Sequence, residues 1–360
     1  MQIKYTIQGL LIYITIATYL LGFVPALLST AMRLREYLRA LGKRAIFLGI
    51  GLFVTGIAGF AIVLVAGSYS WMRDGIFIVL PRIFIVSLAL VVSAVCPILI
   101  GTATIVLQIN LSKRFPEKSR LVLATAERLT KIGGRFFLVG SACVCLAYVY
   151  RWYHVRHVPL QNLFEVFLCL GMIYPVSLFC RRVLRVRGYS TDMLIGAIVL
   201  FPAGFVFNAE PQQLPPALQS WLFTPHVAVY MLSYIFMLKA TFEALFQIWS
   251  SGLVENNLEY EQSTYRIICV GFPLLTLGLI LGSYWGKLAW GDYWGWDPKE
   301  LWSLASWLVF LGYFHFRYMF GKKHPRINSL WAIAGMVAII ITLLWVNLSR
   351  LFPGLHSYAS

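Results

Sequence analysis

Tryptophan and glycine alternate in one short stretch of the chain, residues 285–307, called here the tryptophan segment. It reads WGKLAWGDYWGWDPKELWSLASW and holds half of the chain's 12 tryptophans. An aromatic belt at a membrane surface is the ordinary explanation for such rings, but a belt needs only about one or two rings at each helix end. The glycines between the rings let the backbone approach a flat molecule closely. The segment therefore predicts a binding platform for a large, planar, apolar ligand.

Two histidines flank this segment along the chain. His226 opens an apolar run after Pro225, and His356 follows the last apolar run. An even number of predicted membrane crossings separates each of them from the tryptophan segment, so all three lie on the same side of the membrane. Two imidazoles beside an aromatic platform are the ligand pair of a bis-histidine haem. His226 and His356 are therefore predicted to ligate a haem iron.

A third histidine lies inside the membrane. His315 falls within the predicted span 301–320, about 21 Å from the outer end of that helix. An ionisable side chain at this depth indicates a functional site, although a hydrogen-bonded packing residue is the alternative. His157 opens the stretch HVPLQNLFE, which is predicted to lie on the same side of the membrane as the tryptophan segment. His157 is a candidate for a residue that contacts the haem ligands and holds them in position. No side chain has the setting of a general base or nucleophile, so we predict no further catalytic residue and no other metal.

The stretch Asp297-Pro298-Lys299-Glu300 has the chemistry of a helix start. An Asp caps the free N–H groups, a Pro suits the first helical position, and a Glu at the third position closes a capping box. Asp297 is therefore either a structural cap or part of the ligand platform.

The composition decides the class of protein. The chain has 360 residues, of which 59% are hydrophobic and only 12% charged, whereas soluble proteins average about 45–50% and about 25%. This excess cannot be buried in one soluble core, so the sequence indicates an integral membrane protein. The 30 Lys and Arg against 14 Asp and Glu give a net charge of +16. In a membrane protein that excess is typical of cytoplasmic loops, which argues against nucleic-acid binding.

Apolar runs long enough to cross a bilayer, about 20 residues each, recur along the whole chain. They cover residues 8–28, 45–67, 84–109, 136–153, 163–180, 193–208, 226–248, 266–285, 301–320 and 330–350. The predicted fold is an all-α, polytopic bundle of about ten transmembrane helices. Residues 1–75, with two helices, are interpreted as an addition to a core of residues 76–360. Lys and Arg concentrate in alternate loops, and the positive-inside rule then puts both termini and the loop at 285–302 outside.

Several motifs together resemble one family. WGDYWGWDPKELW resembles the tryptophan-rich WWD signature of the haem-handling membrane proteins of cytochrome c maturation, and in particular the CcsA (ResC) family of the system II pathway. Three further stretches are similar to family segments and occur in the same order: LQSWLFTPHVAVYMLSY, GFPLLTLGLILGSYW and VNLSRLFPGLHSY. With HVPLQNLFE, the resemblance covers about residues 84–358.

Some features depart from the family pattern. Gln161 and Phe164 stand where the family more often has Ser and Tyr. The family core has about eight helices, so the two N-terminal spans are additional. No large external domain is present, which argues against a fused CcsB–CcsA chain.

The resemblance implies that His226 and His356 are external haem ligands. It implies that His315 is a transmembrane ligand whose opposite axial histidine comes from a CcsB/ResB-type membrane partner. The implied haem platform consists of Trp290, Trp294, Trp296 and Asp297. The protein would move haem b to the outer face for thioether attachment to the C-x-x-C-H motif of apocytochrome c. It would be the membrane subunit of a cytochrome c synthase (haem lyase) in a bacterial cytoplasmic or thylakoid membrane, with thioredoxin-like proteins reducing the cysteines.

Three other functions fit parts of the pattern. A system I relative, similar to CcmC or CcmF, would share the tryptophan signature, although the DPKELW continuation and the LHSY ending favour CcsA. A b-type electron-transfer cytochrome commonly pairs its histidines within the bundle, whereas two of the three candidates here are external. An unrelated solute transporter would leave the paired outer histidines unexplained.

Overall fold

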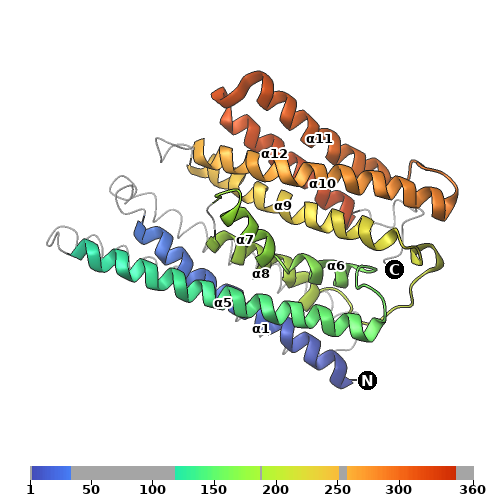
Figure 1. Cartoon of the computed structure of the whole chain (residues 1–360), viewed down its shortest axis with the longest axis horizontal. Helices are drawn as coiled ribbons and strands as arrows, with labels where there is room; N and C mark the ends of the chain where they lie inside the picture. Colours follow the sequence, from blue (N-terminus) through green and yellow to red (C-terminus); the bar gives the residue numbers. More distant parts are fainter. Residues whose placement is uncertain (1, 34–117, 187–188, 251–257, 346–360) are drawn as a thin grey trace, which may run out of the picture. The chain divides into compact units, whose positions relative to one another are not determined.

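The computed structural model describes four stretches of the chain: residues 2–33, 118–186, 189–250 and 258–345. Within these stretches the chain forms helices and connecting segments and no β-strand, so the prediction of an all-α fold is confirmed (Figure 1). Several predicted features lie outside the described residues, namely the spans 45–67 and 84–109, the boundary near residue 75, and His356.

The chain divides into two compact units. Leu20–Gly134 form one, and Met1–Tyr19 with Arg135–Ser360 form the other, which we call the main unit. All contacts discussed below lie within the main unit.

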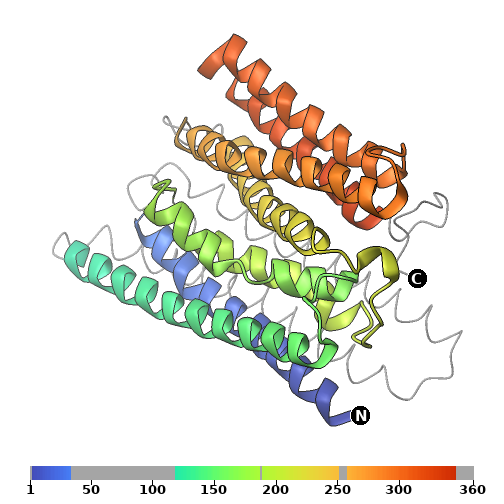
Figure 2. The ribbon, with the colours of Figure 1, turned by 45° about the vertical axis from the view of Figure 1, so that its right-hand side comes forward.

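Helices α1 (Gln2–Arg33) and α5 (Lys118–Val155) each contribute residues to both units. The other described helices of the main unit are α6 (Leu163–Leu170), α7 (Tyr174–Arg182), α8 (Tyr189–Phe205), α9 (Phe223–Ser250), α10 (Leu258–Trp290), α11 (Pro298–Phe320) and α12 (Pro325–Ile340). Short turns of other helix types are η1 (Pro216–Leu218), η2 (Gly321–Lys323) and η3 (Ile341–Trp345). Helices α9 and α10 lie side by side, α11 packs on α12, and α12 also contacts α9 (Figures 1 and 2).

Six helical segments among the described residues are long and apolar enough to cross a membrane. They are Ile7–Ser29, Glu127–Val155, Leu163–Arg182, Phe223–Ile248, Leu258–Trp290 and Pro325–Leu344, and each overlaps a predicted span. Helix α8 overlaps the predicted span 193–208, and α11 covers the predicted span 301–320. These two helices are shorter or less apolar than the six, so the total of ten spans stays a prediction.

The span predicted at 163–180 is built from two helices. Helix α6 ends at Leu170, and α7 begins at Tyr174. Pro175 lacks an N–H group, and its ring would clash with the carbonyl of the residue four positions earlier in a continuous helix, Gly171. The break between α6 and α7 therefore follows from this proline.

Small residues let α9 and α10 approach closely. The Ser233 hydroxyl donates a hydrogen bond to the Gly271 carbonyl at 2.8 Å. A Cβ atom placed on Gly278 would lie only 3.0 Å from the Tyr230 ring. Such contacts associate helices where lipid provides no hydrophobic drive between them. Because residues early on α9 meet residues late on α10, the two helices are antiparallel, and the start of α9 lies beside the end of α10.

Charged side chains are buried between α8 and α9. The Lys239 ammonium lies 2.5 Å from an Asp192 carboxylate oxygen and 3.7 Å from a Glu243 oxygen. The Ser177 hydroxyl also donates to Asp192. These groups compensate one another inside the bundle, where an unpaired charge would be costly. The cluster lies about 20 Å along α9 from His226, so it forms a separate site.

Candidate functional site

A cavity opens at the end of the main unit where α9 begins and α10 ends. Together with its opening to solvent it contains about 1100 Å³ of space. Its walls come from the start of α6, early α9, late α10, the start of α11 and turn η3. Among the lining side chains are His226, Tyr230, Trp285, Trp294, Lys299 and Ser303.

One ring nitrogen of His226 is fixed by the backbone of α10. Its Nδ1 lies 2.9 Å from the Gly278 carbonyl oxygen. A carbonyl can only accept a hydrogen bond, so Nδ1 carries the proton and Nε2 carries the lone pair that a metal ligand needs. Gly282 makes the close approach of the ring feasible, because a Cβ there would lie 2.4 Å from His226 Cε1.

Aromatic rings surround His226. Trp285 is almost parallel to the imidazole, with the ring centres 5.7 Å apart and 28° between the planes. Tyr230 meets the imidazole edge-on at 5.1 Å. The Trp285 indole N–H donates to the Ala217 carbonyl at 3.2 Å, which holds the indole in place. The imidazole is therefore set among rings whose positions are themselves fixed.

The three predicted platform tryptophans have different settings. Trp294 lines the cavity. Trp290 packs edge-on against Trp285 at 4.8 Å but is not among the lining residues. Trp296 is 67% exposed and has a φ of 56°, which a non-glycine residue adopts only when its surroundings require it. Its ring lies edge-on to that of Trp294, with the ring centres 6.2 Å apart.

Asp297 is the cap of α11, which is one of the two roles that its sequence context left open. Its carboxylate accepts a hydrogen bond from the Lys299 backbone N–H at 2.9 Å. In return, Glu300 Oε2 accepts from the N–H groups of Asp297 at 3.2 Å and Gly295 at 2.8 Å. Both halves of the capping box are present. This cap fixes where α11 begins, and Asp297 itself does not line the cavity.

Lys299 was not among the predicted site residues. Its half-buried side chain lines the same cavity as His226. Burial lowers the pKa of Lys299 to about 8, although the nearby Asp297 carboxylate acts in the opposite direction. Lys299 is the one lysine or arginine among the described residues that line the cavity.

His315 lies apart from this cavity. It is an exposed residue on α11, and its Nδ1 lies 2.9 Å from the Leu311 carbonyl oxygen of the preceding turn. Seventeen residues separate it from the start of α11 at Pro298, which corresponds to about 25 Å along the helix. The structure therefore does not bring His315 and His226 together.

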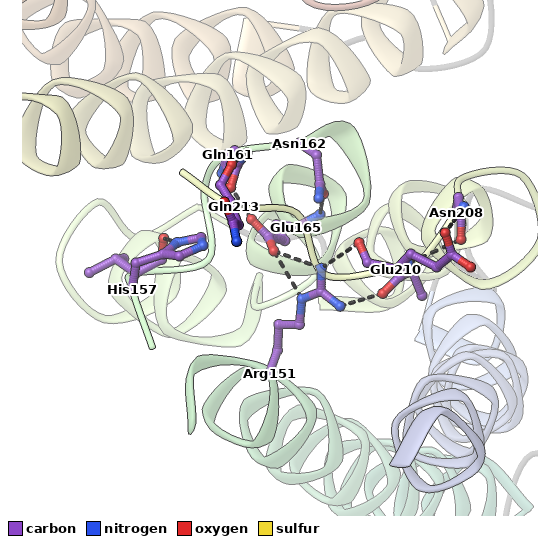
Figure 3. Close-up of polar contacts among 10 residues, drawn as sticks. Arg151, His157, Gln161, Asn162, Glu165, Asn208, Glu210 and Gln213 are labelled. Atoms are coloured by element: carbon purple, nitrogen blue, oxygen red, sulfur yellow. Dashed lines mark hydrogen bonds and ion pairs between the residues drawn. The ribbon is translucent and has the colours of Figure 1, made fainter. Parts of the chain in front are cut away.

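A buried arginine organises the polypeptide behind the cavity. Arg151 of α5 is 1% exposed and lies 2.9 Å from Glu165 of α6. Its guanidinium also donates to the backbone carbonyls of Ala209 and, at 3.3 Å, Glu210 (Figure 3). Arg151 thereby ties α5, α6 and the segment after α8 together.

Gln161 belongs to the same cluster (Figure 3) and lines the cavity. The Gln161 backbone N–H donates to Glu165 at 2.9 Å, and its side-chain amide donates to the Gln213 carbonyl at 2.9 Å. Gln161 and Asn162 both line the cavity. His157 lies next to this cluster, with its Nδ1 3.1 Å from the Val158 carbonyl oxygen, and it lines a second cavity.

Replacing Arg151 with methionine is expected to destabilise the protein by about 3–5 kcal/mol, because Glu165 would remain buried without its counter-charge. The measurement is thermal unfolding of the purified protein in detergent. The double variant Arg151→Met/Glu165→Met should recover part of the loss, since it leaves no buried charge behind. Arg156→Met is the matched control, because Arg156 is exposed in the same region. Equal unfolding temperatures for Arg151→Met and Arg156→Met would contradict the role of the ion pair.

Comparison with known proteins decides the family. A family model described as Cytochrome C assembly protein matches residues 132–353. The cytochrome c biogenesis protein CcsA of Synechococcus sp. (strain CC9902) is 31% identical over 252 residues, covering 58% of this chain and 81% of that protein. CcsA of Porphyra purpurea is 31% identical over 299 residues, covering 67% and 91%. CcsA of Guillardia theta is 34% identical over 259 residues, covering 60% and 82%. The chain belongs to the CcsA family.

Membership of the CcsA family confirms the resemblance found in the sequence motifs. The function is cytochrome c biogenesis, which involves haem and apocytochrome c. Family membership and the six apolar helices together show that the chain is a multi-pass membrane protein. The match over residues 132–353 contains all the elements that line the cavity.

Three residues of this CcsA-family site were missed from the sequence. Trp285 and Lys299 lie within the tryptophan segment, but nothing local distinguishes them from their neighbours. Arg151 falls inside the predicted span 136–153, and a charged residue within a span indicates a buried partner. That signal was available in the sequence, although it does not identify Glu165 as the partner.

Proposed function

We propose that this chain holds haem b at the His226 cavity, on the outer face of the membrane, and presents it to apocytochrome c. It acts in a system II cytochrome c synthase (haem lyase) with a CcsB/ResB-type membrane partner. The observation that carries the proposal is the setting of His226, whose hydrogen bond to Gly278 leaves Nε2 as the ligating nitrogen within an aromatic cavity.

The walls of the cavity suit a porphyrin. Trp285 and Trp294 offer flat, apolar surfaces beside the imidazole.

Thr342 and Leu343 of turn η3 also line the cavity, and His356 follows Leu343 by thirteen residues. A chain of that length spans at most roughly 47 Å when extended, so His356 is within reach as the second axial ligand. Trp290, Trp296 and Asp297 support the platform through Trp285, Trp294 and the cap of α11.

The reaction needs positioning more than acid–base chemistry. In each attachment, the S–H bond of an apocytochrome cysteine adds across a haem vinyl group. A C–S bond forms at the inner vinyl carbon, the proton ends on the terminal carbon, and no electrons are lost or gained overall. Fixing the porphyrin while a C-x-x-C-H segment approaches makes this step effectively intramolecular. Thioredoxin-like proteins would keep the two thiols reduced beforehand.

A second haem position lies at His315 within the membrane. The exposure of His315 on α11 supports a ligand shared with another chain, because an exposed imidazole is accessible to a partner. The CcsB/ResB-type partner would supply the opposite axial histidine. Haem would pass from this position to the His226 cavity, in a bacterial cytoplasmic or thylakoid membrane.

Residues 1–75 would be an addition to the haem-handling core. His157 would support the residues of the outer site without ligating the haem itself.

The direct test is to purify the full chain in detergent, alone and with its partner, and to record the reduced absorption spectrum and the pyridine haemochrome. A b-type haem in the complex, together with thioether formation on an added C-x-x-C-H apocytochrome, is the expected result. Replacing the two substrate cysteines with serine should abolish the product. Haem-free protein in both preparations, from cells that mature cytochrome c normally, would overturn the proposal.

A further inference from the structure

An axial histidine alone does not orient a haem. Ligation by His226 fixes the iron, but the porphyrin can still rotate about the iron–nitrogen axis. The two vinyl groups and the two propionates occupy opposite sides of the ring, so this rotation decides which substituents the substrate meets. A site that presents vinyl groups in a defined direction therefore needs a second, off-axis anchor.

The cavity contains one acidic and one cationic side chain among its described lining residues, Glu300 and Lys299. Glu300 is engaged at the helix start, where Oε2 accepts from the N–H groups of Gly295 and Asp297. Its carboxylate therefore acts on the backbone of α11. The Lys299 side chain brings a positive charge to a half-buried position in the same cavity as His226.

The other lysine near the tryptophan segment is directed elsewhere. Lys287 of α10 is exposed, and its ammonium donates to the Gly291 carbonyl at 2.5 Å and lies 5.5 Å from the centre of the Tyr293 ring. It does not line the cavity. The two lysines thus have the same charge and lie at neighbouring helix ends, but only Lys299 faces the cavity.

We propose that the Lys299 ammonium binds a propionate of the haem and thereby sets the rotation of the porphyrin about the His226–iron axis. This inference rests on the proposed function, because it takes haem as the occupant of the cavity. A carboxylate that enters a half-buried site needs a compensating charge, and a charge-assisted hydrogen bond supplies it. With the propionate edge held at Lys299, the vinyl groups point to the opposite side of the cavity.

The test compares haem with haem dimethyl ester, in which both propionates are uncharged. Full-length protein carrying His315→Ala is titrated in detergent with each compound, so that only the cavity site is counted, and binding is followed by the Soret band. The His315→Ala protein, which is the parent of all further variants, is expected to bind haem about tenfold more tightly than the diester. That preference corresponds to the usual strength of a hydrogen bond to a charged group. Lys299→Gln should abolish the preference by weakening haem binding, while diester binding stays unchanged.

Two further variants complete the experiment. Lys299→Arg keeps the charge and should keep most of the preference, whereas Lys287→Gln is the matched control and should leave the preference intact. Unchanged diester binding in Lys299→Gln shows that this variant is folded. An equal preference for haem in the parent protein and in Lys299→Gln would overturn the inference.

The failure of this inference is distinguishable from the failure of the proposed function. If His226→Ala abolishes binding of both compounds but Lys299→Gln keeps the parent's preference, the cavity binds haem and Lys299 is not its anchor. If His226→Ala binds both compounds as the parent does, haem does not occupy the cavity, and both proposals fall.

Discussion

Cells that carry His226→Ala are expected to lose haem from the outer site and to produce at least roughly 100-fold less mature cytochrome c, while the protein still inserts into the membrane. Replacing a residue that only hydrogen-bonds to a metal ligand typically lowers metal affinity or activity by about 10–100-fold. His226 is the proposed ligand itself, so its loss should have a larger effect. Insertion depends on the apolar helices and not on this side chain. The measurements are haem-stained cytochrome c, the amount of the protein in membranes, and its haem spectrum after purification.

Two additional experiments separate loss of the ligand from loss of the fold. Free imidazole added to purified His226→Ala should restore haem binding, because it can occupy the space that the side chain leaves. His324→Ala is the matched control, since His324 is exposed at the start of α12 and does not line the cavity. Normal cytochrome c levels in His226→Ala cells would remove His226 from the list of ligands.

Replacing His315 with alanine is expected to deplete haem from both positions, because the proposed route passes through the membrane site before the outer one. His315 is exposed on α11, so its loss removes little packing and should leave the stability of the chain nearly unchanged. The measurement is the haem content of the purified complex with its partner, compared with that of the unmodified complex. Cytochrome c maturation should fall together with haem content.

His154→Ala is the control for this second prediction. His154 also lies on a long apolar helix and makes the same kind of contact, with its Nδ1 2.7 Å from the Tyr150 carbonyl oxygen of the preceding turn. It should retain full haem content. Complete haem occupancy at the His226 cavity in cells carrying His315→Ala would break the proposed order of the two sites.

The sequence by itself determined the class of protein, the family and several elements. Apolar runs of about 20 residues predict helices because the bilayer core has a fixed thickness, and six such helices lie within the described residues. The start of α11 was also predictable, because a capping box is formed by residues within four positions of one another. An even number of predicted membrane crossings separates His226 from the tryptophan segment, and this number alone predicted that both lie at the same end of the bundle.

Only the tertiary structure decided how these parts meet. The bond of His226 to Gly278 spans 52 positions, and that of Arg151 to Glu210 spans 59. No local pattern encodes which of several tryptophans stacks on the imidazole, or that Lys299 faces the cavity while Lys287 does not. Such choices depend on helix rotation and on close approach at glycines, which are properties of the packed bundle. Local chemistry therefore predicts which groups are present, and packing decides which of them act together.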